Sequence, residues 1–239
     1  MSELQAVLFD MDGTLVETEH YWDSALEELA VRLGGRLSST ARAGMTGASV
    51  PVSLQLLYDD IGVPRTREES AGDDAWLQAR VVALLTAGVT WQPGAKALLA
   101  AVRAAGIPTA LVTTTHRPLT AIVLGHLAAD LTGWDPAEET PGEHPFTVTV
   151  CGDEVPAVKP DPAPYLQAMT ALGVEPAGCV VVEDSVAGVT AGLAAGAVVL
   201  GMPSLQGVPG RPGLTVLPTL VGVGVDELHE LVAARGGSA

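Results

Sequence analysis

Short apolar runs alternate with longer helical stretches along most of the chain, and no other feature of the sequence constrains the fold as strongly. The apolar runs lie at residues 6–9, 107–113, 147–151, 179–183 and 197–201. Stretches long enough for crossover helices lie between them, at residues 96–105, 118–129, 162–172 and 186–195. Strands buried on both faces read as short runs rich in Val or Leu, and connecting helices place such strands in a parallel sheet. The sequence therefore predicts an α/β fold built on a Rossmann-like parallel sheet.

One segment, from about residue 17 to residue 89, interrupts this alternation because its pattern is helical. Apolar residues recur there at spacings of three and four, first at Trp22, Ala25, Leu26, Leu29, Ala30 and Leu33, then at Leu54, Leu57, Tyr58 and Ile61. Thr66 and Glu69 have the spacing of a capping box, which marks the start of a third helix. A helical insert after the first strand predicts a second, smaller domain. We therefore expect a core of residues 1–16 and 90–239, and a helical domain of residues 17–89.

Acidic residues outnumber basic ones by 28 to 12, which gives a formal net charge of −16. Nucleic acids and anionic membranes are bound through basic surfaces, so this balance argues against both as partners. Residues 185–210 carry no charge, but their frequent Gly and Pro favour a short buried helix and a strand over a membrane span. The N-terminus has no secretory signal, and two cysteines cannot build a disulfide framework. These features predict a cytoplasmic protein.

The strongest chemical signal is a pair of carboxylates directly after the first predicted strand. Asp10 and Asp12, followed by Gly13, leave the carboxyl end of that strand, where open α/β sheets place their ligands. Two carboxylates this close repel one another unless a cation compensates, and an oxygen-rich site suits Mg²⁺. Gly13 lets the backbone pass close to a ligand. Taken alone, the same pattern is equally typical of an ordinary Asp-Gly turn.

A second acidic pair, Glu183 and Asp184, ends another predicted strand. If the two strands are parallel neighbours, both pairs meet at one edge of the sheet, and four carboxyl groups at one edge require a metal. Lys159 precedes a predicted helix and is one of only two lysines in the chain. Its compact ammonium suits the neutralisation of clustered oxygens. On its own such a lysine is more typical of a surface position, whereas beside two acidic pairs it indicates a site.

The second predicted strand of the core ends in three hydroxyls, those of Thr113, Thr114 and Thr115. A hydroxyl and the exposed amides of such a turn can bind phosphate oxygens. A threonine-rich turn that binds nothing gives the same pattern, so this signal is open when taken alone.

Taken together, these motifs resemble those of the haloacid dehalogenase-like hydrolase superfamily, in the same order and over nearly the whole chain. The matching motifs are Asp10-x-Asp12-Gly13-Thr14, Thr113 after a strand, Lys159-Pro160, and Glu183-Asp184 after a strand. The helical segment after the first motif is similar to the cap of the subfamily that includes phosphoglycolate phosphatases, sugar phosphatases and β-phosphoglucomutase. The resemblance implies a Rossmann-like core with an α-helical cap, and Mg²⁺-dependent hydrolysis of a small-molecule phosphate ester.

The resemblance also implies catalytic roles. Asp10 would be the nucleophile that forms an aspartyl-phosphate. Asp12 would protonate the leaving alkoxide and later take a proton from the attacking water. Members that dehalogenate carbon substrates lack this second aspartate, so its presence favours phosphate esters.

The remaining implied roles concern the phosphoryl group and the metal. Lys159 and Thr113 would stabilise the charge on the transferring phosphoryl group, helped by main-chain amides around Met11 and Thr114. The implied metal ligands are Asp10, Asp184, the main-chain carbonyl of Asp12 and, directly or through water, Glu183.

Two other functions stay open. In β-phosphoglucomutase the cap bears a His and an Arg, but Trp22 and Val50 stand at those positions here, which weakens a hexose-phosphate mutase interpretation. The candidates for binding a second anion are Arg42, His116 and Arg117. A non-catalytic phospho-acceptor module is the alternative from a different class. The expected assembly is a monomer or homodimer, and residues 125–145 are expected to form an irregular excursion that contributes to specificity.

Overall fold

The computed structural model describes residues 3–45, 50–132, 145–202 and 210–236. The chain divides into two compact units: residues 1–17 together with 90–239, called the core unit below, and residues 18–89, called the helical unit. Each unit is described by itself.

A parallel six-stranded sheet forms the centre of the core unit. Its order is β5-β4-β1-β6-β7-β8, so β1 lies between β4 and β6. The strands are β1 (Ala6–Phe9), β4 (Thr109–Val112), β5 (Val148–Val150), β6 (Cys179–Glu183), β7 (Val198–Gly201) and β8 (Leu214–Val216). The predicted α/β fold with a parallel sheet is confirmed. β8 is an additional edge strand that sequence reasoning missed, because only three partly exposed residues form it.

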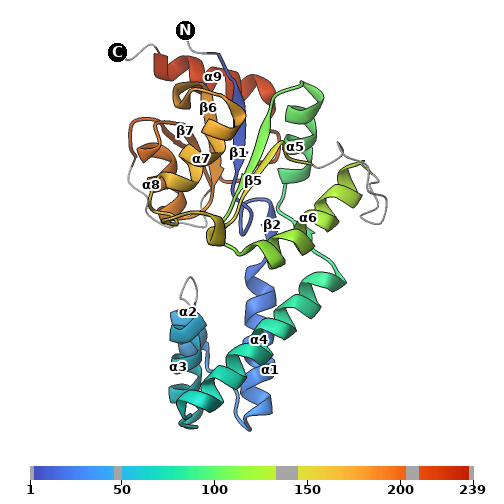
Figure 1. The fold of residues 1–239 in the computed structure, drawn as a ribbon, viewed down its shortest axis with the longest axis vertical. Helices are drawn as coiled ribbons and strands as arrows, with labels where there is room; N and C mark the ends of the chain where they lie inside the picture. Colours follow the sequence, from blue (N-terminus) through green and yellow to red (C-terminus); the bar gives the residue numbers. More distant parts are fainter. Residues whose placement is uncertain (1–2, 46–49, 133–144, 203–209, 237–239) are drawn as a thin grey trace. The chain divides into compact units, whose positions relative to one another are not determined.

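Helices cover the sheet of the core unit. They are α5 (Ala95–Ala104), α6 (Arg117–Thr132), α7 (Ala163–Leu172), α8 (Val186–Ala194) and α9 (Val225–Gly236), with short 3₁₀ turns η1 (Gly152–Glu154) and η2 (Pro176–Gly178). Figure 1 shows α7 and α8 side by side against the strands, and they pack on β1, β4 and β5 and on β6 and β7 respectively. The strands alternate their side chains between two layers. Ala6 and Leu8 therefore face the α7–α8 layer, where Tyr165 is fully buried.

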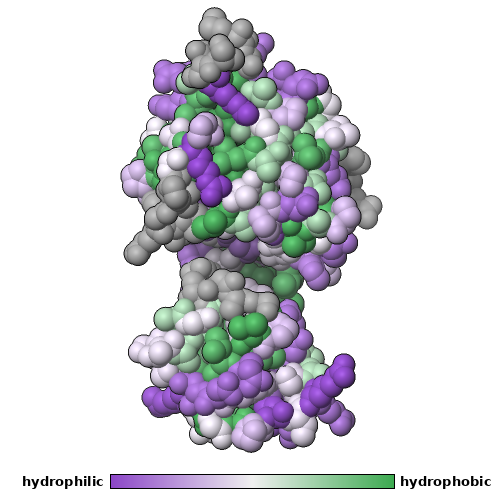
Figure 2. Space-filling view, turned by 90° about the vertical axis from the view of Figure 1, so that its left-hand side faces the viewer, coloured by the Kyte–Doolittle hydropathy of each residue, from purple (hydrophilic) through white to green (hydrophobic). Residues whose placement is uncertain are grey.

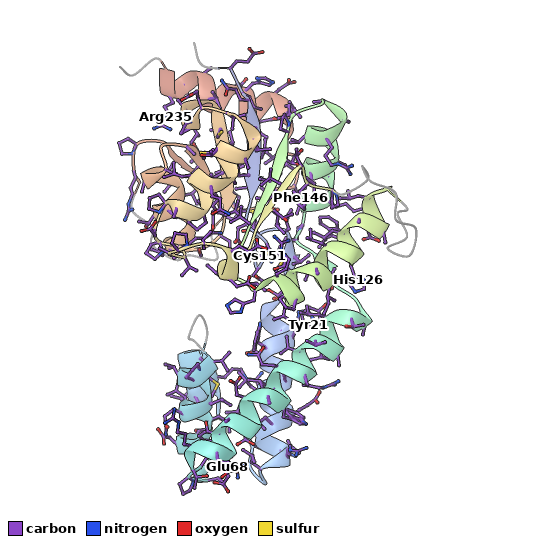
Figure 3. All side chains as sticks on the ribbon, in the orientation of Figure 1. Tyr21, Glu68, His126, Phe146, Cys151 and Arg235 are labelled. Atoms are coloured by element: carbon purple, nitrogen blue, oxygen red, sulfur yellow. The ribbon has the colours of Figure 1, made fainter. Side chains whose placement is uncertain are left out.

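The opposite layer takes the alternate residues of the same strands. Phe9 packs edge-on against Phe146, with ring centroids 6.3 Å apart. Figure 3 labels Phe146 and also Cys151, the residue that follows β5. Helices α5 and α9 pack against one another, and α9 also packs on β6 and β7. Their buried side chains include Leu98, Leu99, Val102, Leu228 and Val232.

The helical unit contains α1 (Glu19–Arg32), α2 (Ser39–Met45), α3 (Val50–Ile61) and α4 (Arg67–Ala87). Thr66 caps α4 through the predicted capping box with Glu69. The apolar periodicity of the sequence matches the buried faces of α1 and α3, and Leu29 and Leu57 are fully buried there. Tyr21 of α1, labelled in Figure 3, donates a hydrogen bond to the carbonyl of Gly88 after α4 over 2.8 Å.

The chain leaves and re-enters the core unit through a short antiparallel pair of strands. β2 (Val16–Glu17) pairs with β3 (Thr90–Trp91), so that Val16 lies opposite Trp91. The ends of the helical insert are therefore adjacent within the core unit. Sequence reasoning missed both strands, because two residues are too few for a periodic pattern to show.

Hydrophilic side chains are spread over the visible surface of each unit, with small apolar patches between them (Figure 2). In the part that the structure describes, residues 185–202, the uncharged stretch forms α8 and β7, as predicted. Among the helices in the described parts of the chain, none combines the length and apolarity that crossing a membrane requires.

Candidate active site

The carboxyl ends of three neighbouring strands bring the candidate site residues to one edge of the sheet. Phe9 at the end of β1 lies in register with Leu111 of β4 and Val182 of β6. Asp10 follows β1 directly, Thr113 follows β4, and Glu183 is the last residue of β6. These side chains, far apart in the sequence, therefore share one end of the parallel sheet, as the motif analysis predicts for such strands.

Lys159 is the cation at the centre of this edge. Its buried Nζ donates to Asp10 Oδ1 and to Glu183 Oε1 over 2.6 Å each, and to the main-chain oxygen of Val112 over 2.7 Å. An ammonium has three protons, so all three find an acceptor and the group is held in one place. The lysine thus links the carboxylates that follow β1 and end β6.

The ionisation of Asp10 and Lys159 reflects this crowding. Burial by itself disfavours the charged ammonium, but the Asp10 and Glu183 carboxylates outweigh it and raise the pKa of Lys159 above its ordinary value. The pKa of Asp10 is also raised well above its ordinary value, because burial dominates and because Glu183, Asp184 and Asp12 add negative charge. One ammonium therefore does not balance the negative charge of this edge.

Glu183 is fixed more tightly than any sequence motif indicates. Its Oε1 accepts from Lys159 and, over 2.8 Å, from the hydroxyl of Tyr165 on α7. Its Oε2 accepts from the amides of Asp184 and Ser185 and from the Ser185 hydroxyl, over 3.0–3.1 Å. A Cβ on Gly188 would lie 1.7 Å from Glu183 Oε1, so only glycine allows the carboxylate to sit against the first turn of α8.

Asp184 lies over the loop that follows β1. The Thr14 hydroxyl donates to its Oδ1 over 3.2 Å, and a Cβ on Gly13 would lie 2.0 Å from its Oδ2. Gly13 has a positive φ of 80°, so it provides both the turn and the space for the carboxylate. The sequence predicts a close approach of a ligand at Gly13, and in the structure the approaching group is the Asp184 carboxylate.

The site has the donor set of a divalent-cation site. Asp10, Glu183 and Asp184 each offer a carboxylate oxygen, and these oxygens lie within 4.8 Å of one another. Oxygen donors are what hard divalent cations prefer, and two positive charges would offset the excess of carboxylates that Lys159 leaves. The residues present therefore fit a divalent metal.

Asp12 is held by the threonine turn after β4. Its Oδ2 accepts from Thr115 Oγ1 over 2.7 Å and from Thr113 Oγ1 over 3.3 Å. Thr113 is buried, whereas Thr114 is exposed at the turn. The sequence pattern shows three hydroxyls in this turn but indicates no role for Thr115. Its contact with Asp12 joins residues 103 positions apart, which no local pattern reveals.

The three candidates for a second anion differ in their surroundings. Arg117 donates to both Glu154 oxygens, over 2.5 and 2.7 Å, and to the Thr149 hydroxyl over 2.8 Å. Arg42 pairs with Glu27 over 3.0 Å, and His116 is exposed. The predicted irregular excursion at residues 125–145 is wrong for its first part, because α6 continues as a helix to Thr132. Residues 133–144 lie outside the described part of the chain.

Comparisons with known proteins show which family and which structures this chain is similar to. A family model for haloacid dehalogenase-like hydrolases matches residues 4–196. The chain is similar to hexitol phosphatase A of Escherichia coli, with 35% identity over 214 residues that cover 84% of each protein. It is similar to the crystal structure of CbbY from Rhodobacter sphaeroides in complex with phosphate, with a TM-score of 0.73 and 26% identity over 94% of this chain and 99% of that one. A provisionally named β-phosphoglucomutase from Thermotoga maritima gives a TM-score of 0.70 at 26% identity, over 98% and 100% of the two chains.

Proposed function

The chain belongs to the haloacid dehalogenase-like hydrolase family, and from that premise we propose that it hydrolyses a small phosphate monoester through an aspartyl-phosphate on Asp10. The observation that carries the proposal is the pair of 2.6 Å hydrogen bonds from Lys159 to Asp10 and Glu183. They hold one buried carboxylate beside a fixed ammonium, at the sheet edge where three strands end. A carboxylate so placed can attack phosphorus while the ammonium faces the phosphoryl oxygens.

The reaction has two halves. In the first, a carboxylate oxygen of Asp10 bonds to phosphorus, the bond to the ester oxygen breaks, and Asp12 gives its proton to the departing alkoxide. In the second, Asp12 takes a proton from water, the resulting hydroxide attacks phosphorus, and Asp10 leaves as a carboxylate with inorganic phosphate as product. Lys159, Thr113 and the amide region of Thr114 are assigned to stabilising the transferring group, where positioning and electrostatics supply most of the rate.

We assign the divalent cation to Mg²⁺. Its ligands would be Asp10, Asp184, the main-chain carbonyl of Asp12 and Glu183. Both Glu183 oxygens already accept hydrogen bonds, which favours contact through water for that residue. When bound, the cation supplies the charge that offsets the clustered carboxylates and the phosphoryl oxygens.

The helical unit is assigned the role of a cap that excludes water from the site during transfer.

The two free cysteines, Cys151 and Cys179, support a reducing compartment and hence the cytoplasm. The assigned partner is the small-molecule substrate, and the proposed assembly is a monomer or homodimer. The similarity to hexitol phosphatase A supports a phosphorylated sugar or polyol as substrate, with phosphoglycolate-like esters as the next class to test.

A hexose-phosphate mutase is the second candidate, favoured by the similarity to a provisionally named β-phosphoglucomutase. A mutase must hold a bisphosphate intermediate and therefore needs a second cationic anchor. The Arg117 guanidinium is already engaged by Glu154 and Thr149, which counts against its use for that purpose. With β-glucose 1-phosphate as substrate, a mutase produces glucose 6-phosphate, whereas a phosphatase releases glucose and inorganic phosphate.

The test of the proposed function is a screen of phosphorylated metabolites for phosphate release with Mg²⁺. We expect Asp10→Asn to abolish turnover, because an amide cannot act as the nucleophile, and we expect EDTA to remove activity until Mg²⁺ is restored. Asp226→Asn, which alters an exposed acid at the start of α9, should turn over like the wild type. Turnover that persists in Asp10→Asn, or a phospho-Asp10 that forms and is not hydrolysed, would contradict the proposal.

A further inference from the structure

We propose that Thr115 is a positioning residue that orients Asp12 for proton transfer to the leaving group, an inference that rests on the proposed phosphatase function. The Thr115 hydroxyl donates to Asp12 Oδ2 over 2.7 Å, which is the shorter of the two hydroxyl contacts to that oxygen. Thr113 also contacts Asp12, but its hydroxyl in addition accepts the amide of Thr115 over 3.0 Å. Thr115 is thus the residue whose hydroxyl makes the close contact.

The main chain around Thr115 is fixed from the neighbouring loop, so the hydroxyl is held in position. The carbonyl oxygen of Thr115 accepts from the amide of Gly152 over 3.1 Å and from the Thr120 hydroxyl over 3.3 Å. A Cβ on Gly152 would lie 2.1 Å from the carbonyl oxygen of Thr114, so the 3₁₀ turn after β5 lies directly against the threonine turn. A side chain on such a braced turn can fix the orientation of the carboxylate it contacts.

Two hydroxyl donors meet on one oxygen of Asp12, because Oδ2 accepts from both Thr113 and Thr115. These contacts fix the rotation of the carboxyl group and so the direction in which it faces the leaving group. When the phosphorus–oxygen bond breaks, the proton passes from the oriented carboxyl group to the leaving alkoxide. The carboxylate that remains keeps both hydroxyl donors, so Asp12 ends the step in a hydrogen-bonded anionic form.

The test compares leaving groups, because only a poor leaving group needs the proton. The variant Thr115→Val keeps the shape of the side chain and removes its donor. The value of kcat/KM, which covers the steps up to departure of the leaving group, is measured for the wild type and the variant with an alkyl phosphate and with p-nitrophenyl phosphate. General acids contribute about 10²- to 10⁴-fold, so we expect kcat/KM for the alkyl ester to fall by about 10-fold or more. With p-nitrophenyl phosphate, whose phenolate leaves without a proton, we expect a change of less than about 3-fold.

Three further variants make the readout specific. Thr115→Ser restores a hydroxyl and should return the alkyl-ester rate to within about 3-fold of the wild type, since the donor is what matters. Thr170→Val removes an exposed hydroxyl that bonds to the carbonyl of Leu166 on α7, and it should leave both substrates unaffected. The thermal unfolding of every variant is measured to establish that it folds. If Thr115→Val does not fold, Thr115→Ala replaces it.

The outcomes separate the two proposals. A loss in Thr115→Val that is equal for both substrates, or no loss for the alkyl ester, overturns the positioning role while the wild-type activity leaves the phosphatase function intact. If the wild type hydrolyses no phosphate ester in the metabolite screen, the proposed function fails and the role of Thr115 fails with it.

Discussion

Gly188 lies directly against the site, because the Glu183 carboxylate occupies the space where another residue would carry its Cβ. That carboxylate holds Lys159, and Lys159 in turn holds Asp10. The contacts of Glu183 with α8 are therefore coupled to the position of the proposed nucleophile. Glycine at this helix position is a requirement of close packing rather than of chain flexibility.

We predict that Gly188→Ala lowers both activity and stability. The new methyl group would lie 1.7 Å from Glu183 Oε1, so the carboxylate must move and its hydrogen bonds to Lys159 and Tyr165 must lengthen or break. A displacement of this size at a catalytic group costs on the order of 10²-fold in kcat. Steady-state kinetics and the melting temperature measure the two effects.

The matched variant is Gly72→Ala, in the interior of α4, where nothing lies within 4 Å of the position that the added methyl group would take. Replacing a helix glycine that has open space by alanine should raise stability by about 0.5–1 kcal/mol. If Gly188→Ala retained full activity and stability, as Gly72→Ala should, the close packing of Glu183 against α8 would not be what keeps Lys159 and Asp10 in position.

At the scale of elements, the sequence predicts those strands and helices that are long enough to show a periodic pattern. The four buried strands β1, β4, β6 and β7 and helices α5 to α8 lie where the alternation places them, with ends shifted by a few residues. The sequence did not predict β8 and α2, because they are short. It did not predict α9, because no predicted strand follows that helix to mark it as a crossover. The start of α4 was predicted because Thr66 and Glu69 carry their own local signal.

That local signal gives a prediction for the helical unit. In α4, the Thr66 hydroxyl accepts from the amide of Glu69, and the Glu69 carboxylate accepts from the amide of Thr66 over 2.8 Å. Thr66→Ala leaves the first-turn amide without its acceptor and should destabilise the helix by about 1 kcal/mol. Hydrogen exchange of the first-turn amides of α4 should accelerate accordingly, and urea unfolding measures the loss of free energy.

The comparison variant for Thr66→Ala is Thr86→Ala near the other end of α4. Thr86 is exposed and its hydroxyl bonds to the Val82 carbonyl oxygen of its own helix, so alanine should be neutral or slightly stabilising there. Equal losses of stability in the two variants would mean that the loss of the cap does not explain the effect.

At the scale of the whole molecule, the sequence identified the residues of the site more readily than the contacts between them. Asp10, Lys159 and Glu183 stand in recognisable local patterns, and the structure joins them by hydrogen bonds across 149 and 24 positions. Tyr165 carries no pattern of its own, and Thr115 is marked only as one of three hydroxyls in a turn. Their contacts arise only when α7 packs on the sheet and the β4–α6 turn reaches the loop after β1, so no local pattern in the chain could reveal them.

The division into two units gives a prediction for the molecule as a whole. Val16 pairs with Trp91 and Glu17 with Thr90, so the ends of the helical unit are adjacent, and a short Gly-Ser linker can replace residues 18–89. The truncated core keeps its sheet and its own buried layers, and we expect it to fold and to hydrolyse p-nitrophenyl phosphate. If the helical unit is a cap that excludes water and helps to orient the substrate, kcat/KM for the best metabolite should fall by about 100-fold. Circular dichroism establishes whether the truncated core folds, and the two assays compare its kcat/KM for the metabolite and for p-nitrophenyl phosphate with those of the full chain. A folded core that retained full activity on the metabolite would show that the helical unit has no such role.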